Sequence, residues 1–91
     1  MSVASLVTAL ERTCALLEHS GESGWSDRTP TEVAKNLRDA IGGLVRGDAV
    51  DHLELRVAFA PTGAVQEIAM ANAWHDEYVQ LARVVDAHTH R

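Results

Sequence analysis

Apolar residues recur at three- and four-residue intervals through the first part of the chain. Between residues 2 and 19 they form one stripe, made of Val3, Leu6, Val7, Leu10, Cys14 and Leu17. Such spacing brings side chains onto one face of an α-helix, where they can pack against a core. Ser20 and Gly21 follow, and glycine ends a helix at little cost because it adopts the left-handed conformation. The pattern predicts a helix over residues 2–19.

The start of a second helix is marked by the sequence Thr29-Pro30-Thr31-Glu32. Threonine at the N-cap can accept a hydrogen bond from the Glu32 amide, the glutamate can bond back to the cap, and proline suits the first helical position. The stripe that follows consists of Val33, Leu37, Ile41, Leu44 and Val45. Gly42-Gly43 interrupts this stripe, which predicts either a bend or the close approach of another helix. Gly47 predicts the end of the helix.

The stretch 49–71 fits two different secondary structures. Apolar residues alternate strictly at Leu53, Leu55, Val57 and Phe59. This alternation predicts a β-hairpin with a turn around Pro61. Helical spacing is met by Val50, Leu53, Val57 and Ala60. Asp48 or Asp51 would cap such a helix, and a lone hairpin is only marginally stable. We favour two short helices broken at Pro61, with a short β-hairpin in 53–70 as the alternative.

The last segment again has helical spacing. Its apolar stripe is formed by Trp74, Tyr78, Leu81 and Val85. Asp76 and Glu77 stand in the first turn, where the helix dipole favours negative charge. The elements together predict a single domain over 1–91 that is mainly α, a compact bundle of about four to five helices.

Composition narrows the class of protein. The chain has 91 residues, 46% of them hydrophobic, but fourteen are alanines, which bring little surface to bury. A homodimer would extend this small core, and we hold it as well supported as a monomer.

The formal net charge is −5 and the eight Lys and Arg residues are spread along the chain. An acidic body without a basic face disfavours nucleic acid as a partner.

The chain also lacks signals for export or for a membrane. No run approaches the ~20 apolar residues that span a bilayer, and the N-terminus lacks the pattern of a signal peptide. We therefore expect a cytoplasmic protein that does not bind membranes. Cys14 is the single cysteine, so it cannot form an internal disulfide, and we expect it to be buried as a small hydrophobe.

Polar and aromatic residues of the loops and helix ends are the candidates for binding a partner. Asp76 and Glu77 project about 100° apart around a helix, which does not suit a pair of catalytic carboxylates. The tail holds Asp86, His88 and His90, but ligands on a chain end bind metal weakly. We expect no catalytic residue, no cofactor and no metal site. The candidate partner-binding residues are Trp25, Glu67, Asn72, His75, Asp76 and Glu77.

Two other functions are weighed against protein binding. The stretch "TPTEVAKNL" at 29–37 resembles the first helix of helix-turn-helix modules, and a hairpin in 53–70 could serve as a wing. The expected recognition helix, however, lacks a basic face. A small enzyme or metal-binding protein using His75 and Glu67 is the second alternative. That alternative predicts a deep pocket that contains these side chains with strongly shifted pKa values.

The stretch 59–86, "FAPTGAVQEIAMANAWHDEYVQLARVVD", resembles a family of small bacterial helical domains. There an aromatic residue and a Gly/Pro turn precede a Gln/Asn–acidic segment and a terminal helix; "ESGW" at 22–25 fits the same pattern. Such domains are similar to immunity-type proteins, which bind and block bacterial toxins. The chain departs from the pattern at Ala60-Pro61 and at Ala73, where glycines are usual. The resemblance implies a non-enzymatic protein-binding domain, and the acidic charge suits a basic toxin.

Overall fold

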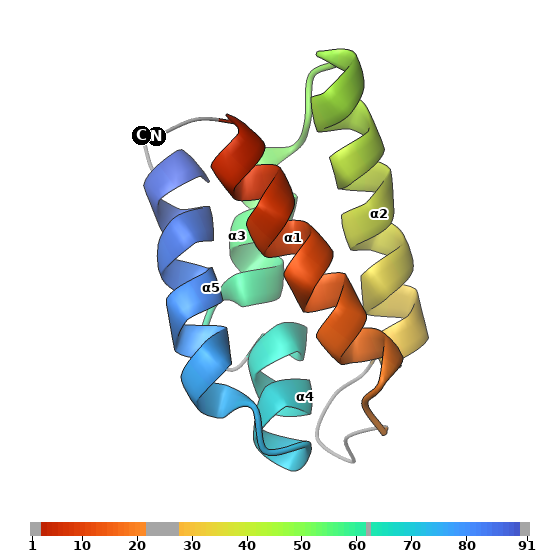
Figure 1. Cartoon of the computed structure of the whole chain (residues 1–91), viewed down its shortest axis with the longest axis vertical. Coiled ribbons are helices and arrows are strands. Elements are labelled where there is room, and N and C mark those ends of the chain that lie inside the picture. Colours follow the sequence, from red (N-terminus) through yellow and green to blue (C-terminus); the bar gives the residue numbers. More distant parts are fainter. Residues whose placement is uncertain (1–2, 22–27, 62, 90–91) are drawn as a thin grey trace.

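The computed structural model describes residues 3–21, 28–61 and 63–89, and this part of the chain folds into five helices. The long helices α1 (Val3–Glu18) and α2 (Pro30–Arg46) pack side by side, and α5 (His75–Thr89) lies along the other flank of α1 (Figure 1). The short helices α3 (His52–Phe59) and α4 (Ala64–Ala71) pack against α5 and against each other. The predicted mainly α class is confirmed.

The β-hairpin in 53–70 is wrong, because the described part of this stretch is helical and holds no strand. The alternating apolar residues of this stretch lie on two faces of α3, one buried and one exposed. Leu55 and Phe59 are buried, whereas Leu53 and Val57 have exposed fractions of 65% and 61%. Asp51 caps the helix by accepting a hydrogen bond from the Glu54 amide. Without a hairpin, the helix-turn-helix alternative loses its wing.

The predicted cap of α2 is confirmed, and both of its reciprocal hydrogen bonds are present. The Glu32 amide donates a 3.1 Å hydrogen bond to Thr29 Oγ1, and the Thr29 amide donates a 3.0 Å bond to Glu32 Oε1. These bonds lower the pKa of the Glu32 carboxyl. At the other end Gly47 has a φ of 77°, the left-handed conformation in which glycine closes a helix.

Gly42-Gly43 does not interrupt α2, which continues to Arg46. A close approach exists at Gly43, but it comes from the connecting loop and not from another helix as predicted. Val50 Cγ2 lies 3.0 Å from the position that a Cβ would occupy at Gly43, and the Asp48 amide donates a 2.8 Å hydrogen bond to the Gly43 carbonyl. The glycine therefore lets the loop from α2 to α3 fold back against the helix.

The turn between α3 and α4 is crowded by backbone carbonyls. A Cβ at Gly63 would lie 2.7 Å from the Val57 oxygen, 2.8 Å from the Ala60 oxygen and 3.0 Å from the Ala58 oxygen. The Gly63 amide donates a 2.8 Å hydrogen bond to the Ala60 carbonyl. Two short helices broken at Pro61 are confirmed, and glycine is the residue that lets the second begin so close to the first.

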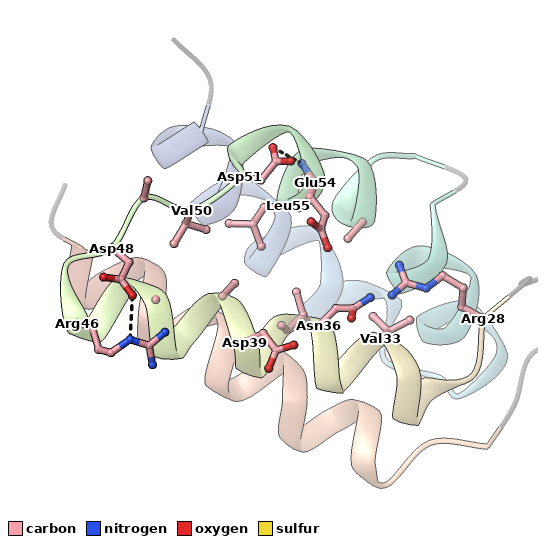
Figure 2. Close-up of a pocket in the computed structure, with 15 residues that line it drawn as sticks. Arg28, Val33, Asn36, Asp39, Arg46, Asp48, Val50, Asp51, Glu54 and Leu55 are labelled. Atoms are coloured by element: carbon pink, nitrogen blue, oxygen red, sulfur yellow. Dashed lines mark hydrogen bonds and ion pairs between the residues drawn. The ribbon is translucent and has the colours of Figure 1, made fainter.

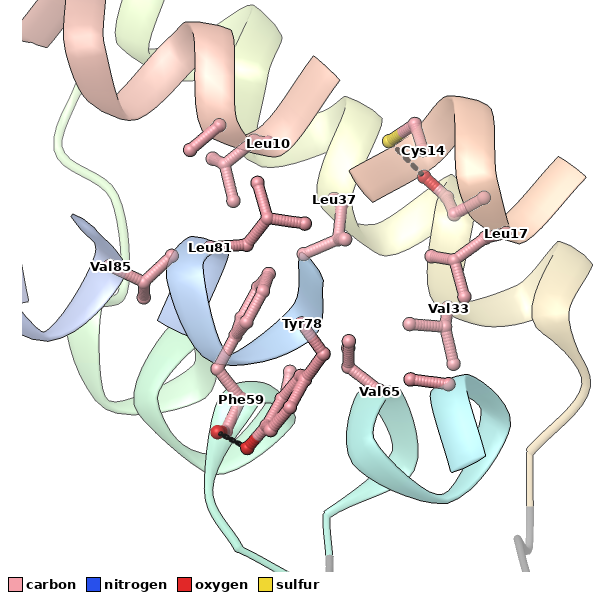
Figure 3. Packing of buried hydrophobic residues seen from close by; sticks show 14 of the residues in the cluster. Leu10, Cys14, Leu17, Val33, Leu37, Phe59, Val65, Tyr78, Leu81 and Val85 are labelled. Atoms are coloured by element: carbon pink, nitrogen blue, oxygen red, sulfur yellow. Dashed lines mark hydrogen bonds between the residues drawn. The ribbon is translucent and has the colours of Figure 1, made fainter. Parts of the chain in front are cut away.

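All five helices contribute to one hydrophobic core (Figure 3). The predicted inward positions of α5 are confirmed, since Trp74, just before it, and Tyr78, Leu81 and Val85 within it are buried. Cys14 is also buried, as predicted, with its thiol directed at the Ala34 carbonyl, and burial raises its pKa. The core consists of Leu6, Ala9, Leu10, Cys14, Leu17, Val33, Ala34, Leu37, Leu55, Ala58, Phe59, Val65, Ile68, Ala69, Trp74, Tyr78, Leu81 and Val85.

None of the helices within residues 3–21, 28–61 and 63–89 has the length and apolar character needed to cross a bilayer.

Candidate functional site

A groove of about 330 Å³ lies between α2 and α3 (Figure 2). It exists because α2 packs on α1 and α3 packs on α5, so the facing sides of the two helices are left partly open. Its floor is apolar and largely buried. The floor is formed by Val33, Leu37, Ala40, Val50, Leu55 and Ala58.

The rim of the groove carries four carboxylates and two guanidinium groups: Asp39, Asp48, Asp51, Glu54, Arg28 and Arg46. Arg46 Nε lies 2.8 Å from Asp48 Oδ2, so these two charges neutralise each other at one end. Arg28 stands at the other end (Figure 2). The rim therefore carries more negative than positive charge.

Asp39 and Glu54 stand on opposite walls near the middle of the groove, and the Glu54 side chain points from α3 toward α2 (Figure 2). Within the described ranges neither forms an ion pair. Both residues are exposed, so their charges are open to solvent or to a bound molecule. The middle of the groove is consequently its most acidic part.

Next to the groove, α3 presents a pair of apolar side chains to solvent. Leu53 and Val57 lie one helical turn apart and are 65% and 61% exposed. We call this pair the α3 ridge. Glu54 follows Leu53 on the same helix, so the ridge and the rim of the groove are neighbours. The α3 ridge is thus a small exposed apolar surface on the helix that also carries Glu54.

The candidates with a described placement lie in α4, at its end and at the start of α5. Trp25 falls outside the described residues. Asn72 has a structural role: its Oδ1 accepts a 2.8 Å bond from the Gly21 amide, and its Nδ2 donates to the carbonyls of Gly21 and Ile68 at 2.9 Å. Nearby, Trp74 Nε1 donates a 2.9 Å bond to Ser20 Oγ. These bonds fasten the end of α1 to the α4–α5 turn.

Glu77 forms a two-point ion pair with Arg12 of α1, at 2.5 Å from Nε and 2.9 Å from Nη2. The hydrogen bonds from Arg12 lower the pKa of the Glu77 carboxyl. The pair is exposed, so it adds little stability but orients α5 against α1. Asp76 is exposed at the first turn of α5, as expected for a charged helix start.

Neither His75 nor Glu67 lines the groove. His75 Nε2 lies 3.4 Å from Gln66 Nε2, and its ring contacts the Tyr78 ring with centroids 5.5 Å apart. Glu67 stands in the first turn of α4, where negative charge is favoured.

Among the residues with a described placement, no group of three His, Cys, Asp or Glu side chains could hold a metal ion, and His90 lies outside them.

The sequence interpretation missed the groove. A signal was available once 52–59 is taken as helical: Asp48, Asp51 and Glu54 recur every third residue, next to the apolar Leu53 and Val57. Asp39 could not be joined to them, because its place opposite Glu54 depends on how α2 and α3 diverge.

No family model, curated protein or solved structure matches the chain. The resemblance to immunity-type domains stays a prediction.

Proposed function

We propose that this domain is a non-enzymatic protein-binding module that holds a basic segment of another protein in the groove between α2 and α3. The observation that carries the proposal is an apolar floor between two walls that carry the carboxylates of Asp39 and Glu54, which form no ion pair with any residue the structure describes. An apolar floor rewards burial of aliphatic side chains, and the acidic rim selects partners with basic flanks.

The α3 ridge enlarges this surface. Covering Leu53 and Val57 would remove two mostly exposed aliphatic side chains from water. Full burial of such a side chain contributes about 1.5–3 kcal/mol, so two of them can act as anchors of an interface. The floor and the ridge supply binding energy, while the carboxylates supply selectivity.

The finer proposal is an immunity-type role, in which the partner is a basic bacterial toxin and binding blocks it. It is supported by the net charge of −5 and by the sequence resemblance of residues 59–86. The location proposed for this encounter is cytoplasmic. A homodimer that buried the α3 ridge would compete with such a partner, so the mass of the protein in solution is measured first, by sedimentation equilibrium.

The test is capture of basic proteins encoded beside this gene by the immobilised domain. We expect one of them to be retained by the native chain and lost when Asp39 and Glu54 are both replaced by lysine. The matched control is Glu11→Lys together with Asp86→Lys, which makes the same change of charge away from the groove. Failure to retain any of these proteins, or equal loss with the control, would contradict the proposal.

A further inference from the structure

The exposed side of α3 carries three kinds of side chain in a fixed order around the helix. The α3 ridge, Leu53 and Val57, occupies the middle. At 100° per residue, Glu54 projects about 80° to one side of the ridge and Arg56 about 80° to the other. All four side chains are exposed. The helix therefore presents an acidic flank, an apolar ridge and a basic flank to solvent.

The surroundings of α3 agree with this order. Glu54 lines the groove toward α2, whereas Arg56 lines a separate surface depression with Arg83 and Asp86 of α5. In Figure 1, α3 lies between α2 and α5. Neither Arg56 nor Arg83 forms an ion pair within residues 3–21, 28–61 and 63–89. Two arginines stand against one carboxylate there, so this flank is positive in a chain whose net charge is −5.

The order of acid, ridge and base is complementary to itself. Two copies can lay their α3 helices side by side in the same direction, about a two-fold axis parallel to the helices. The ridge of one copy then meets the ridge of the other, and each acidic flank faces a basic flank. In an antiparallel pair acid would face acid and base would face base, which is destabilising. The charges of α3 therefore select the parallel arrangement.

The size of the contact limits its strength. The helix has eight residues, and only its ridge and flanks would be covered. Stable complexes bury about 1,200–2,000 Å² in total, and one short helix from each copy provides less. Half of the chains should therefore be paired only at about 0.1–1 mM. At micromolar concentrations the ridge stays open to other proteins.

We infer that the α3 ridge is a self-association surface, on which a second copy of this chain docks with its α3 parallel and its Arg56 opposite Glu54. The inference goes beyond the proposed function, because it names a contact between copies of this chain and is tested with this chain alone. Pairing covers the ridge and engages Glu54, so it opposes capture of a basic partner at high concentration.

Single cysteines test both the pairing and its direction. In the parallel dimer residue 57 faces residue 57 of the second copy, and residue 53 faces residue 53. Leu53→Cys and Val57→Cys, each at about 0.2 mM under mild oxidation, should form linked dimers at least about tenfold faster than the exposed control Glu11→Cys on α1. The native Cys14 is fully buried and takes no part. A mixture of the two ridge variants should give fewer mixed than matched disulfides.

Charge variants test the flanks, and sedimentation equilibrium up to about 1 mM measures them. Arg56→Glu makes both flanks acidic and Glu54→Arg makes both basic, so each variant alone should self-associate about fivefold more weakly than the native chain. An equimolar mixture of the two should recover the native strength. Leu53→Ser should weaken pairing at least about fivefold, whereas Val3→Ser, which removes an exposed aliphatic side chain from α1, should not.

Three results would each overturn the inference: a chain that stays monomeric up to about 1 mM, ridge cysteines that link no faster than Glu11→Cys, or no recovery in the charge mixture. Predominantly mixed disulfides between the two ridge variants would also reject it, since they indicate antiparallel pairing. Failure here is distinct from failure of the proposed function, because capture of basic proteins is measured at concentrations where the chain is a monomer.

Discussion

The Tyr78 hydroxyl donates a 2.6 Å hydrogen bond to the carbonyl oxygen of Phe59, the last residue of α3 (Figure 3). A carbonyl at the end of a helix has no partner in the helix itself, and this one is buried. Tyr78 thus supplies the missing donor and ties α5 to the helix that forms one wall of the groove.

Replacing Tyr78 by phenylalanine should therefore lower the free energy of unfolding by about 1–2 kcal/mol, because a buried carbonyl loses its donor while the ring still fills the core. Urea denaturation measures the change. The control is Thr13→Val, which deletes a buried hydroxyl bonded to Ala9 O, a carbonyl that α1 already satisfies. That substitution should be close to neutral. Equal losses in the two variants would show that the Tyr78 bond has no special role.

Alkaline pH should weaken the fold through the same side chain. Burial, and secondarily the charge of Asp86, raises the pKa of Tyr78. The stabilising effect of the neutral phenol is complete below the ordinary tyrosine pKa of about 10 and is lost as the pH rises from there to the folded-state value. The difference in stability between the native chain and Tyr78→Phe should shrink over that range.

Tyr78 is the single tyrosine of the chain, so the phenolate absorbance reports it alone. Its titration midpoint in the folded protein should lie above about 10. A midpoint at or below the value in the denatured protein would contradict the expectation.

Replacing Gly63 by alanine should destabilise the domain by about 1–3 kcal/mol, because the new Cβ meets three backbone oxygens that cannot move singly. The nearest of these is 2.7 Å away. The paired variant is Gly42→Ala, whose Cβ would meet only the flexible end of Arg46 inside α2. It should stabilise the helix by up to about 1 kcal/mol. Thermal unfolding of both variants should give shifts of opposite sign.

Replacing Ala73 by glycine should raise stability by up to about 1 kcal/mol, since alanine is strained in the left-handed conformation. Ala73 has a φ of 63° and follows α4, where the Trp74 amide donates to Ala69 O, the arrangement that usually has glycine at this position. Ala71→Gly, two residues earlier and inside the helix, should instead cost about 1 kcal/mol. A loss of stability in both variants would show that the turn tolerates alanine without strain.

The parts of the fold that were predictable are those decided by neighbours in the sequence. The cap at Thr29 and Glu32 needs only residues three apart, and the stripe from Trp74 to Val85 needs only helical periodicity. The stretch 53–59 was ambiguous for a physical reason. An alternating pattern is also produced when a helix buries Leu55 and leaves Leu53 exposed, and the sequence does not say which residues remain in water.

The groove could not be predicted from local sequence patterns, because the residues that line it come together only when the helices pack. Asp39 and Glu54 stand on helices that are each anchored to a different neighbour. Likewise, Glu77 looked like a charged helix start, and its partner Arg12 is 65 residues away in sequence. Asn72, a candidate for binding, bonds instead to Gly21 across 51 residues. Side chains that looked free to bind a partner in the sequence are therefore engaged in structural contacts with residues far away along the chain.

Because α3 is held at its start by Asp51 and at its end by Tyr78, the wall that it forms is pre-organised. Ordering a residue costs about 1–2 kcal/mol of backbone entropy, and this wall would need no such ordering when a ligand arrives. Encounter would then be followed directly by docking. The observed on-rate should rise linearly with ligand concentration and steeply as ionic strength falls, with no plateau set by an internal opening step.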